Sequence, residues 1–539
     1  MKKVFLFCCV LSFKVFGQEK PKLVVGIVVD QMCYDYLYRF QHHFSTDGFN
    51  RFLKSGVNCR NTNYTYVPTY TGPGHASIYT GTTPSNHGIV GNEWFDRTQN
   101  VPMNCVYDPH VLPVGNSSSA YGKVSPYRLE TLTITDQLKL TYPESKVFSV
   151  SIKDRSAALP GGHLSDGSYW FDYSSGSFIT STYYMNTLPA WVRAFNSINN
   201  ADSYLADWDL LHAATSYSRQ IDDSPYEVTI QGMQHPTFPY AFTQFAKGNY
   251  SQFTLTPFAN TLLTDFATHL IKEEQLSKGP SSNMLCISYS TPDIVGHAFG
   301  PYSMEIEDLY ARLDIEIAKL LNVLDDEIGK HNYLVFLTAD HAVVPVPQQL
   351  IDLKLPGGYF DESALILSIK SRLLEVYHQD LLSSVENQNI YLNRPLIDSL
   401  NLDLNTIQEE VASLIRSNTS VKTVVSATQL DHGQITDPWK QMIAKGYTKE
   451  RSGDVIFMLK PGFLSVENGP LDAHKGTSHG SAFNYDTHVP LLWYGNHLKP
   501  KDVYKPIEIT DISATLVHLL NLQRAGSMTG KPILELLGH

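Results

Sequence analysis

Four runs of largely apolar, β-favouring residues constrain the fold of this chain more than any other feature of its sequence. Residues 23–29 read Leu-Val-Val-Gly-Ile-Val-Val, and comparable runs occupy residues 146–152, 284–289 and 333–338. Such runs are typical of strands buried on both faces of a parallel sheet. We therefore predict an α/β fold with a mainly parallel central sheet flanked by helices. Ligands bind at the carboxyl ends of the strands in such sheets, so the polar residues after each run are candidates for a site.

A second element joins a β-favouring lead-in to the start of a helix at Thr71. Residues 67–77 read Val-Pro-Thr-Tyr-Thr-Gly-Pro-Gly-His-Ala-Ser. Pro73 suits a first helical turn, and Gly72 and Gly74 allow backbone to approach a ligand closely. Free amides and the helix dipole attract an anion to such a place, phosphate above all. Thr71 is therefore a candidate nucleophile, with the alternative that it only caps the helix.

Two cations and one amide are candidates for holding that anion. Lys153 and Arg155 directly follow the run at 146–152. Arginine offers a bidentate fork to an anion, and lysine offers a point charge. Asn92, in the turn-rich segment 85–94, can offer an amide donor. The alternatives are a solvated charge cluster for the first two residues and a turn position for Asn92.

Carboxylates and imidazoles follow three of the runs in patterns that suit a metal ion. They are Asp30 after the first run, Asp293 and His297 after the run at 284–289, and Asp340 with His341 after the run at 333–338. One helical turn or a tight loop brings such pairs to a single cation. Taken singly, each pattern also fits a helix cap or an unrelated surface histidine. A further candidate is His479, which lies between small residues, and composition alone does not rank it above His474 and His488.

Composition limits the classes of function. The chain has 539 residues, 42% of them hydrophobic, and a formal net charge of −12, which argues against a nucleic-acid-binding surface. Residues 1–17 resemble a secretory signal peptide with cleavage before Gln18, so we predict export to the periplasm or medium. No later segment reads as a membrane span. An exported chain can form disulfides, and Cys59 with Cys105 is a possible pair.

Two stretches interrupt the α/β pattern. Residues from about 160 to 250 are rich in Tyr, Trp, Ser and Asp, and residues 345 to 454 combine amphipathic helices with a strand at 421–425. We predict that both are insertions into one catalytic domain, 18–539, and that they cover the strand ends as cap regions. Residues 454–459 are expected to return to the main sheet.

The order of these residues along the chain resembles the alkaline phosphatase superfamily, over nearly the whole mature chain apart from the two insertions. The resemblance implies two zinc ions. One takes Asp293, His297 and His479, and the other takes Asp30, Asp340, His341 and the nucleophile oxygen of Thr71. The family pattern Gly-Thr-x-His-Gly, present at residues 476–480, selects His479 over its neighbours.

The branch of the superfamily follows from the residues around Thr71. The segment lacks the Cys/Ser-x-Pro-x-Arg pattern of sulfatases, while a threonine nucleophile is shared with nucleotide pyrophosphatase/phosphodiesterases and with the phosphate-irrepressible bacterial alkaline phosphatases. Lys153, Arg155 and Asn92 look like the phosphoryl-oxygen contacts of the second group. In that comparison Lys153 replaces the third metal, so no magnesium is predicted.

The resemblance implies an exported, monomeric phosphate monoester hydrolase of broad specificity that acts through a phosphothreonine intermediate. Its ligands are phosphate monoesters and inorganic phosphate. Histidine ligands protonate in acid, so the affinity for zinc should fall as the pH falls. We therefore expect the activity to have an alkaline pH optimum. The alternatives are a phosphodiesterase or nucleotide pyrophosphatase and, more distantly, a metal-binding scaffold without catalysis.

Overall fold

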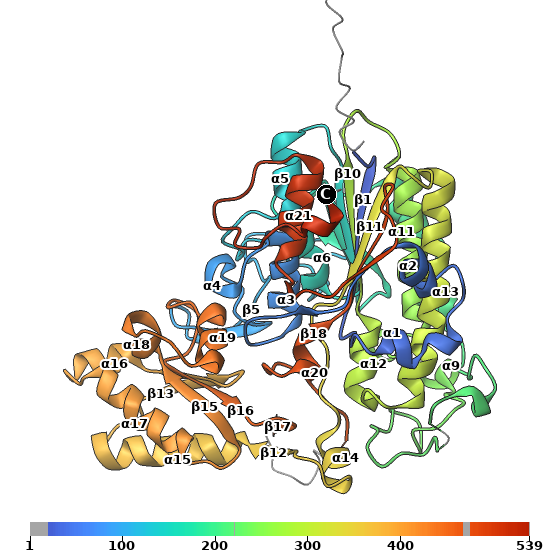
Figure 1. Cartoon of the computed structure of the whole chain (residues 1–539). Helices are drawn as coiled ribbons and strands as arrows, with labels where there is room; N and C mark the ends of the chain where they lie inside the picture. The colour runs from blue at the N-terminus through green and yellow to red at the C-terminus, as the bar shows by residue number, and fades with distance from the viewer. Residues whose placement is uncertain (1–19, 220, 467–474, 538–539) are drawn as a thin grey trace, which may run out of the picture.

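A ten-stranded sheet forms the centre of the molecule (Figure 1). The structure, a computed structural model, describes residues 20–219, 221–466 and 475–537, so the predicted signal peptide and His474 lie outside the described residues. Strand β1 (Leu23–Val29) pairs in parallel with β10 (Asn283–Tyr289) on one side and β11 (Tyr333–Thr338) on the other, and β7 (Val147–Ser151) follows β10. These are the four apolar runs of the sequence, and the predicted fold class is confirmed.

The sheet extends further than expected on the β7 side. Strand β8 (Gly167–Asp172) is parallel to β7, and β9 (Ser177–Ser181) pairs with β8 antiparallel. The prediction that the first insertion begins at about residue 160 is therefore wrong for these residues. Every residue of β8 is buried, because its aromatic side chains pack into the core of the catalytic body, so a composition rich in Tyr and Trp marks a core strand here.

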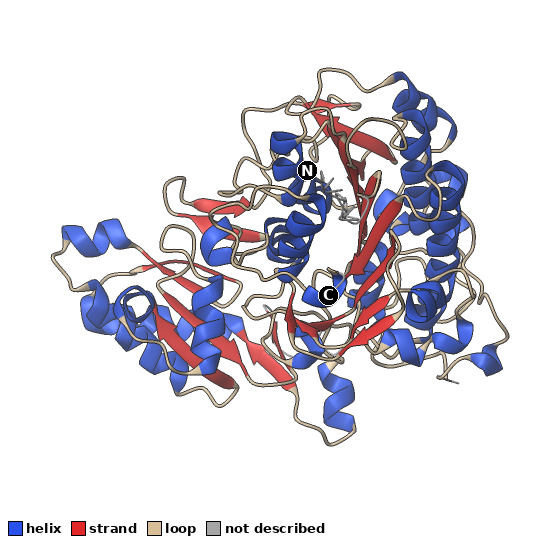
Figure 2. Ribbon diagram, turned by 45° about the horizontal axis from the view of Figure 1, so that its top comes forward, coloured by secondary structure: helices blue, strands red, loops and turns tan. Residues whose placement is uncertain are grey.

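On the other side of the sheet, the strand that follows β11 is antiparallel to it. Strand β19 (Leu491–Gly495) pairs antiparallel with β11, followed by β2 (Val57–Cys59) and β20 (Lys501–Val503). Helices cover both faces of the sheet (Figures 1 and 2). One face carries α11 (Phe258–Glu273) and α13 (Met304–Glu327), and the other carries α3 (Thr71–Thr80), α6 (Asp154–Gly161) and α21 (Asp511–Leu520).

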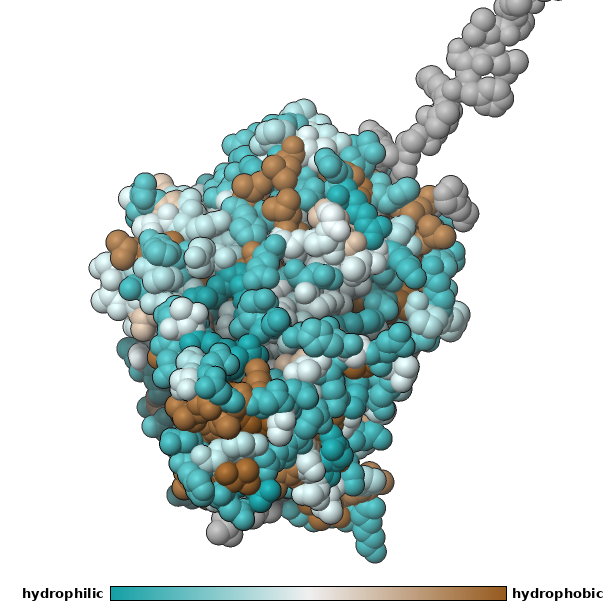
Figure 3. All heavy atoms as spheres, turned by 90° about the vertical axis from the view of Figure 1, so that its left-hand side faces the viewer, coloured by the Kyte–Doolittle hydropathy of each residue, from teal (hydrophilic) through white to brown (hydrophobic). Residues whose placement is uncertain are grey.

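Residues 358–466 form a separate unit, which we call the cap (orange in Figure 1). Its main sheet has the order β13 (Leu382–Glu386), β14 (Asn389–Leu392), β16 (Val455–Leu459) and β15 (Val421–Ser426). Strand β12 (Gly358–Asp361) pairs with β17 (Phe463–Val466). Helices α15 (Glu362–Tyr377) and α17 (Leu404–Arg416) pack on the main cap sheet and complete a core of their own. The side of the molecule on which the cap lies is largely hydrophilic, with apolar side chains in separate patches (Figure 3).

The cap corrects one expectation about the chain path. Residues 454–459 were expected to return to the main sheet, but β16 lies between β14 and β15 in the cap sheet. An apolar run does not reveal which of two cores it enters, since either core buries it equally well. The cap therefore continues past residue 454 to β17.

Two smaller points concern cysteines and membranes. The described cysteines are all free, and both Cys59 and Cys105 are buried without a disulfide, so the pairing that the sequence left open is not formed.

Among the described residues, no helix has the length and apolarity that crossing a bilayer requires.

Candidate active site

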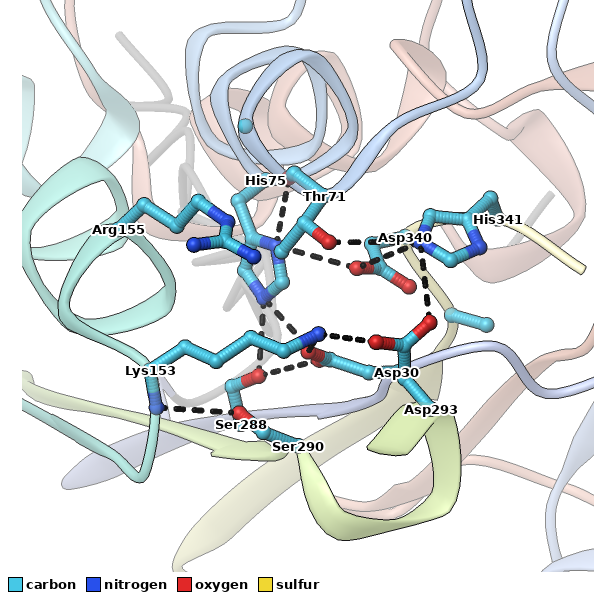
Figure 4. A network of polar contacts seen from close by, with 12 residues as sticks. Asp30, Thr71, His75, Lys153, Arg155, Ser288, Ser290, Asp293, Asp340 and His341 are labelled. Carbon is cyan, nitrogen blue, oxygen red and sulfur yellow. Dashed lines mark hydrogen bonds and ion pairs between the residues drawn. The ribbon is translucent and has the colours of Figure 1, made fainter. Parts of the chain in front are cut away.

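Three neighbouring strands deliver acidic side chains to one edge of the sheet. Asp30 follows β1, Asp340 follows β11, and Asp293 lies in the first turn of α12 (Thr291–Phe299), directly after β10. All three are at most 3% exposed. Thr71 is the first residue of α3, and its Oγ1 lies 3.5 Å from Nε2 of His341 (Figure 4). Residues far apart in the sequence thus meet around the threonine hydroxyl.

One group of metal-type donors surrounds Asp293. Nε2 of His297 lies 3.2 Å from Oδ1 of Asp293, and Nε2 of His479 lies 3.5 Å from the same oxygen. Nδ1 of His297 donates to the Thr477 carbonyl at 2.8 Å, and Nδ1 of His479 donates to the Thr69 carbonyl at 2.7 Å. A carbonyl only accepts, so each Nδ1 carries a proton and each Nε2, the nitrogen with a lone pair in the neutral ring, faces a carboxylate. Such an electron-rich group fits a bound cation.

His488, an alternative to His479, does not join this group. Its Nε2 bonds with the Arg60 carbonyl at 3.0 Å, and its ring stacks on Tyr34.

A second group of donors surrounds Asp30 and Asp340. Nε2 of His341 lies 3.3 Å from Oδ2 of Asp340, while its Nδ1 donates to the Ala342 carbonyl at 3.0 Å. Oδ2 of Asp340 is buried and has no hydrogen-bond donor among the described residues. Burial, and then the charge of Asp30, raise the pKa of Asp340 well above its ordinary value. Two carboxylates and an imidazole around an unsatisfied oxygen fit a divalent metal of the zinc type.

The predicted anion clamp lies beside these acids. Lys153 precedes α6, and its ammonium contacts Asp293 and lies 3.2 Å from Oδ2 of Asp30. Burial opposes ionisation of Asp293, but Lys153 and then His297 hold its pKa well below the ordinary value. Figure 4 shows Lys153 reaching toward Asp293 and Asp30, with the guanidinium of Arg155 on the same side of the site, near His75.

Asn92, the third predicted clamp residue, lies in the loop between α4 (Pro84–His87) and β4 (Glu93–Asp96). Its Oδ1 accepts the Gly72 N–H at 2.7 Å, and its amide NH2 has no acceptor among the described residues, so it can donate to a ligand. A Cβ at residue 72 would lie 3.2 Å from that Oδ1 and 3.1 Å from Sγ of Cys105, so glycine next to Thr71 avoids a tight contact.

Comparison with known proteins identifies the family of this chain. The sequence pattern of the type I phosphodiesterase/nucleotide pyrophosphatase family matches residues 24–482. The chain belongs to this family. The resemblance to the alkaline phosphatase superfamily is thereby confirmed, with relatives that carry the alkaline phosphatase name.

Relatives of this phosphodiesterase-family chain match it over nearly its full length. Alkaline phosphatase PafA of Elizabethkingia meningoseptica is 38% identical, over 96% of this chain and 95% of its own. A Myroides odoratus protein named calcium-transporting ATPase is 39% identical, over 98% and 97%. The crystal structure of wild-type alkaline phosphatase PafA superposes with a TM-score of 0.92 at 37% identity, covering 96% of this chain and 99% of that one.

Sequence reasoning missed a residue that joins the two donor groups of this family member. The Gln31 N–H donates to Oδ1 of Asp340 at 3.1 Å, and the Gln31 side-chain amide donates to Oδ1 of Asp293 at 2.7 Å. Gln31 has φ +65°, an uncommon backbone conformation for this residue type. A Cβ at Gly296 would lie 1.9 Å from Oε1 of Gln31, so a larger residue there would displace the Gln31 amide from this position. The only signal in the sequence was its position directly after Asp30.

His75 was also missed, although it lies four residues after Thr71 on the same face of α3. Its Nδ1 donates to the Thr71 carbonyl at 2.9 Å, and its Nε2 bonds with Oγ of Ser288 at 2.9 Å. Ser288 in turn donates to Asp30 at 2.6 Å. Both nitrogens of His75 are engaged, so we assign it to holding the Thr71 turn against the strand ends, with His341 presenting Nε2 to the site.

Proposed function

We propose that the protein is a zinc-dependent phosphate monoester hydrolase of broad specificity that forms a phosphothreonine intermediate. The observation that carries this proposal is the position of Thr71. Its buried hydroxyl lies at the N-terminus of α3, beside the donor groups and within the clamp of cations. Relatives named alkaline phosphatase support the same activity.

Two sets of side chains would hold the metals. One zinc ion would take Asp30, Asp340, His341 and Thr71, where His341 faces Asp340 and Thr71. The other would take Asp293, His297 and His479. When bound, the zinc pair supplies the charge that lowers the pKa of the Thr71 hydroxyl and neutralises the leaving alkoxide. Lys153 occupies the space between Asp30 and Asp293, where its ammonium supplies positive charge, so we propose no magnesium.

The chain's own groups account for the transfer itself. Thr71 Oγ1 forms a bond to phosphorus as the bond to the alcohol oxygen breaks, and water then displaces the threonine oxygen to release phosphate. Lys153, Arg155 and the Asn92 amide bind the equatorial oxygens, where charge resides in a loose phosphoryl-transfer transition state. A monoester dianion carries more charge than a diester, so two cations in the clamp favour monoesters.

The competing activity is phosphodiester hydrolysis, which the family name also includes. The deciding measurement is kcat/KM for an aryl phosphate monoester and for its methyl diester. We expect the monoester to be preferred, and a preference for the diester would reject the proposal. Zinc-loaded Thr71→Ala should lose roughly 10⁴-fold or more of the activity while still binding zinc, and Thr71→Ser should retain part of it.

Metal dependence is tested separately from the nucleophile. Metal analysis of the pure protein should give two zinc ions per chain, and prolonged chelation should abolish turnover until zinc is restored. If magnesium alone restored the activity, the zinc assignment would be wrong.

We further propose that residues 1–17 direct export to the periplasm or medium and that the mature protein is a monomer. N-terminal sequencing of the exported protein should begin at Gln18, and light scattering should give the mass of a single chain.

A further inference from the structure

A cavity of about 360 Å³ lies between the catalytic body and the cap. The cap contributes the hairpin between β13 and β14 together with residues of β16 and β17. The body contributes Tyr70, the residue before the nucleophile, and the loop 478–481 that carries His479. This volume is in the range of pockets that bind small molecules.

The cavity meets the candidate active site at His479. In the proposed reaction, the alcohol oxygen departs opposite Thr71, on the side of Asp293, His297 and His479. The ring of Tyr70 stands edge-on to that of His479 at 5.4 Å, and both residues line the cavity. The group attached to the departing oxygen therefore extends from the phosphate site toward the cap.

The charge of this cavity is opposite to that of the phosphate clamp. Glu362, Glu386 and Asp486 line it, and its described lining includes no lysine or arginine. Asp486 is 1% exposed, and its Oδ1 has no hydrogen-bond partner in the described part of the chain. Burial, and then the charges of Glu362 and Asp486, raise the pKa of the Tyr70 phenol, and burial raises the pKa of Asp486 itself to about 7. An anion in this cavity would lie near the carboxylates of Glu362 and Glu386, whereas a metal held by His479 would place positive charge only where the cavity meets the active site.

The hairpin tip adds uncharged polar groups. Asn387 and Gln388 both have positive φ, which fits a tight two-residue turn, and Asn387 donates to the Glu93 carbonyl at 3.0 Å. This contact ties the cap to the residue next to Asn92. The Gln388 amide lines the cavity, and no side-chain hydrogen bond to it occurs among the described residues, so it is available to a ligand.

We propose that this cavity binds the alcohol portion of the substrate and selects phosphate monoesters whose alcohol carries an ammonium group over those whose alcohol carries a carboxylate. The proposal rests on the monoesterase function proposed above and defines its substrate class. Aromatic rings and carboxylates together bind ammonium groups, and amides serve their neutral polar parts. The cations of the clamp then bind the phosphate of the substrate, and the acids of the cavity bind the ammonium group at its other end.

The test compares three alkyl monoesters on the zinc-loaded enzyme: phosphoethanolamine, glycerol 3-phosphate and 3-phosphoglycerate. We expect kcat/KM to fall in that order, with about tenfold or more between the first and the last. Glu362→Gln combined with Glu386→Gln should reduce this ratio to about threefold, because two of the acids are removed. Raising the ionic strength should reduce it as well.

Glu375→Gln is the matched control. Glu375 lies on the same helix as Glu362, but its side chain is 70% exposed and pairs with Arg372 outside the cavity. This variant should keep the wild-type ratio. Turnover of a small aryl phosphate and the melting temperature show whether each variant is folded and active.

The outcomes separate the two proposals. If the wild type hydrolyses all three alkyl monoesters with equal kcat/KM and the double variant behaves identically, the cavity assignment is wrong and the monoesterase function stands. If the wild type hydrolyses none of them and no aryl monoester, the proposed function itself is rejected.

Discussion

Two places in this chain bury pairs of carboxylates, and they differ in what surrounds the acids. At the strand ends, Asp30 and Asp340 lie beside Lys153 and the lone pair of His341. Under the loops after β9, Glu227 and Glu305 are at most 1% exposed, and each has one oxygen without a partner among the described residues. Their nearest recorded cation, Arg219, is 3.9 Å from Glu227.

The difference decides what each pair can do. Burial raises the pKa of both Glu227 and Glu305 well above the ordinary value, which favours their neutral forms, and Tyr240 donates to Glu305 at 2.6 Å. The strand-end acids have imidazole nitrogens directed at them and Thr71 within reach. Burial alone therefore yields inert carboxylic acids, whereas burial together with oriented imidazoles yields a metal-type site.

The largest difference between the two carboxylate pairs is expected when the cation beside each pair is removed in a separate variant. Lys153→Ala should lower kcat/KM for an aryl phosphate monoester by about 10²–10³-fold, because the clamp loses a charge that the transition state needs. Arg219→Ala, which removes the cation near the other pair, should leave kcat/KM unchanged. Equal losses in the two variants would contradict the assignment of Lys153 to the phosphate clamp.

A smaller effect is expected from the hydrogen bonds that orient the acids. Gln31→Met removes the amide donor to Asp293 and should weaken zinc binding by about 10-fold or more, as loss of such supporting contacts does elsewhere. Competition with a chromogenic chelator measures this directly. Tyr240→Phe removes the analogous donor to Glu305 and should leave zinc affinity as in the wild type. A Gln31→Met variant with unchanged zinc affinity would show that this residue does not position the ligands.

The smallest effect concerns stability and pH at the second pair. A carboxyl with a raised folded-state pKa stabilises the fold below its unfolded pKa, and that contribution is lost as pH rises through the folded value. For Glu305 the loss falls between an ordinary pKa of 4.5 and about 8. The free energy of unfolding should therefore fall between pH 6 and pH 9 in the wild type. In Glu305→Gln this fall should be smaller by on the order of 2 kcal/mol. Denaturant unfolding at both values measures it, and parallel losses in both proteins would mean that Glu305 is ionised in the fold.

Much of this protein was determined by local sequence. The four apolar runs form strands because residues buried on both faces must be apolar wherever they lie in the sheet, and Thr71 begins α3 because glycine and proline end the preceding extended segment. The donors after each run meet because parallel strands end at one edge. These relations act over a few residues or through one topological rule, so the pattern alone predicts them.

Tertiary structure decided the rest. Gln31 connects the two donor groups only because β11 and α12 lie on either side of it, and His75 matters only because Ser288 faces it from β10. The residues of β8 were assigned to an insertion and those of β16 to the main sheet, since an apolar strand carries no mark of its partner. The cavity of the cap exists only between two folded units, so its charge depends on side chains that no local pattern brings together.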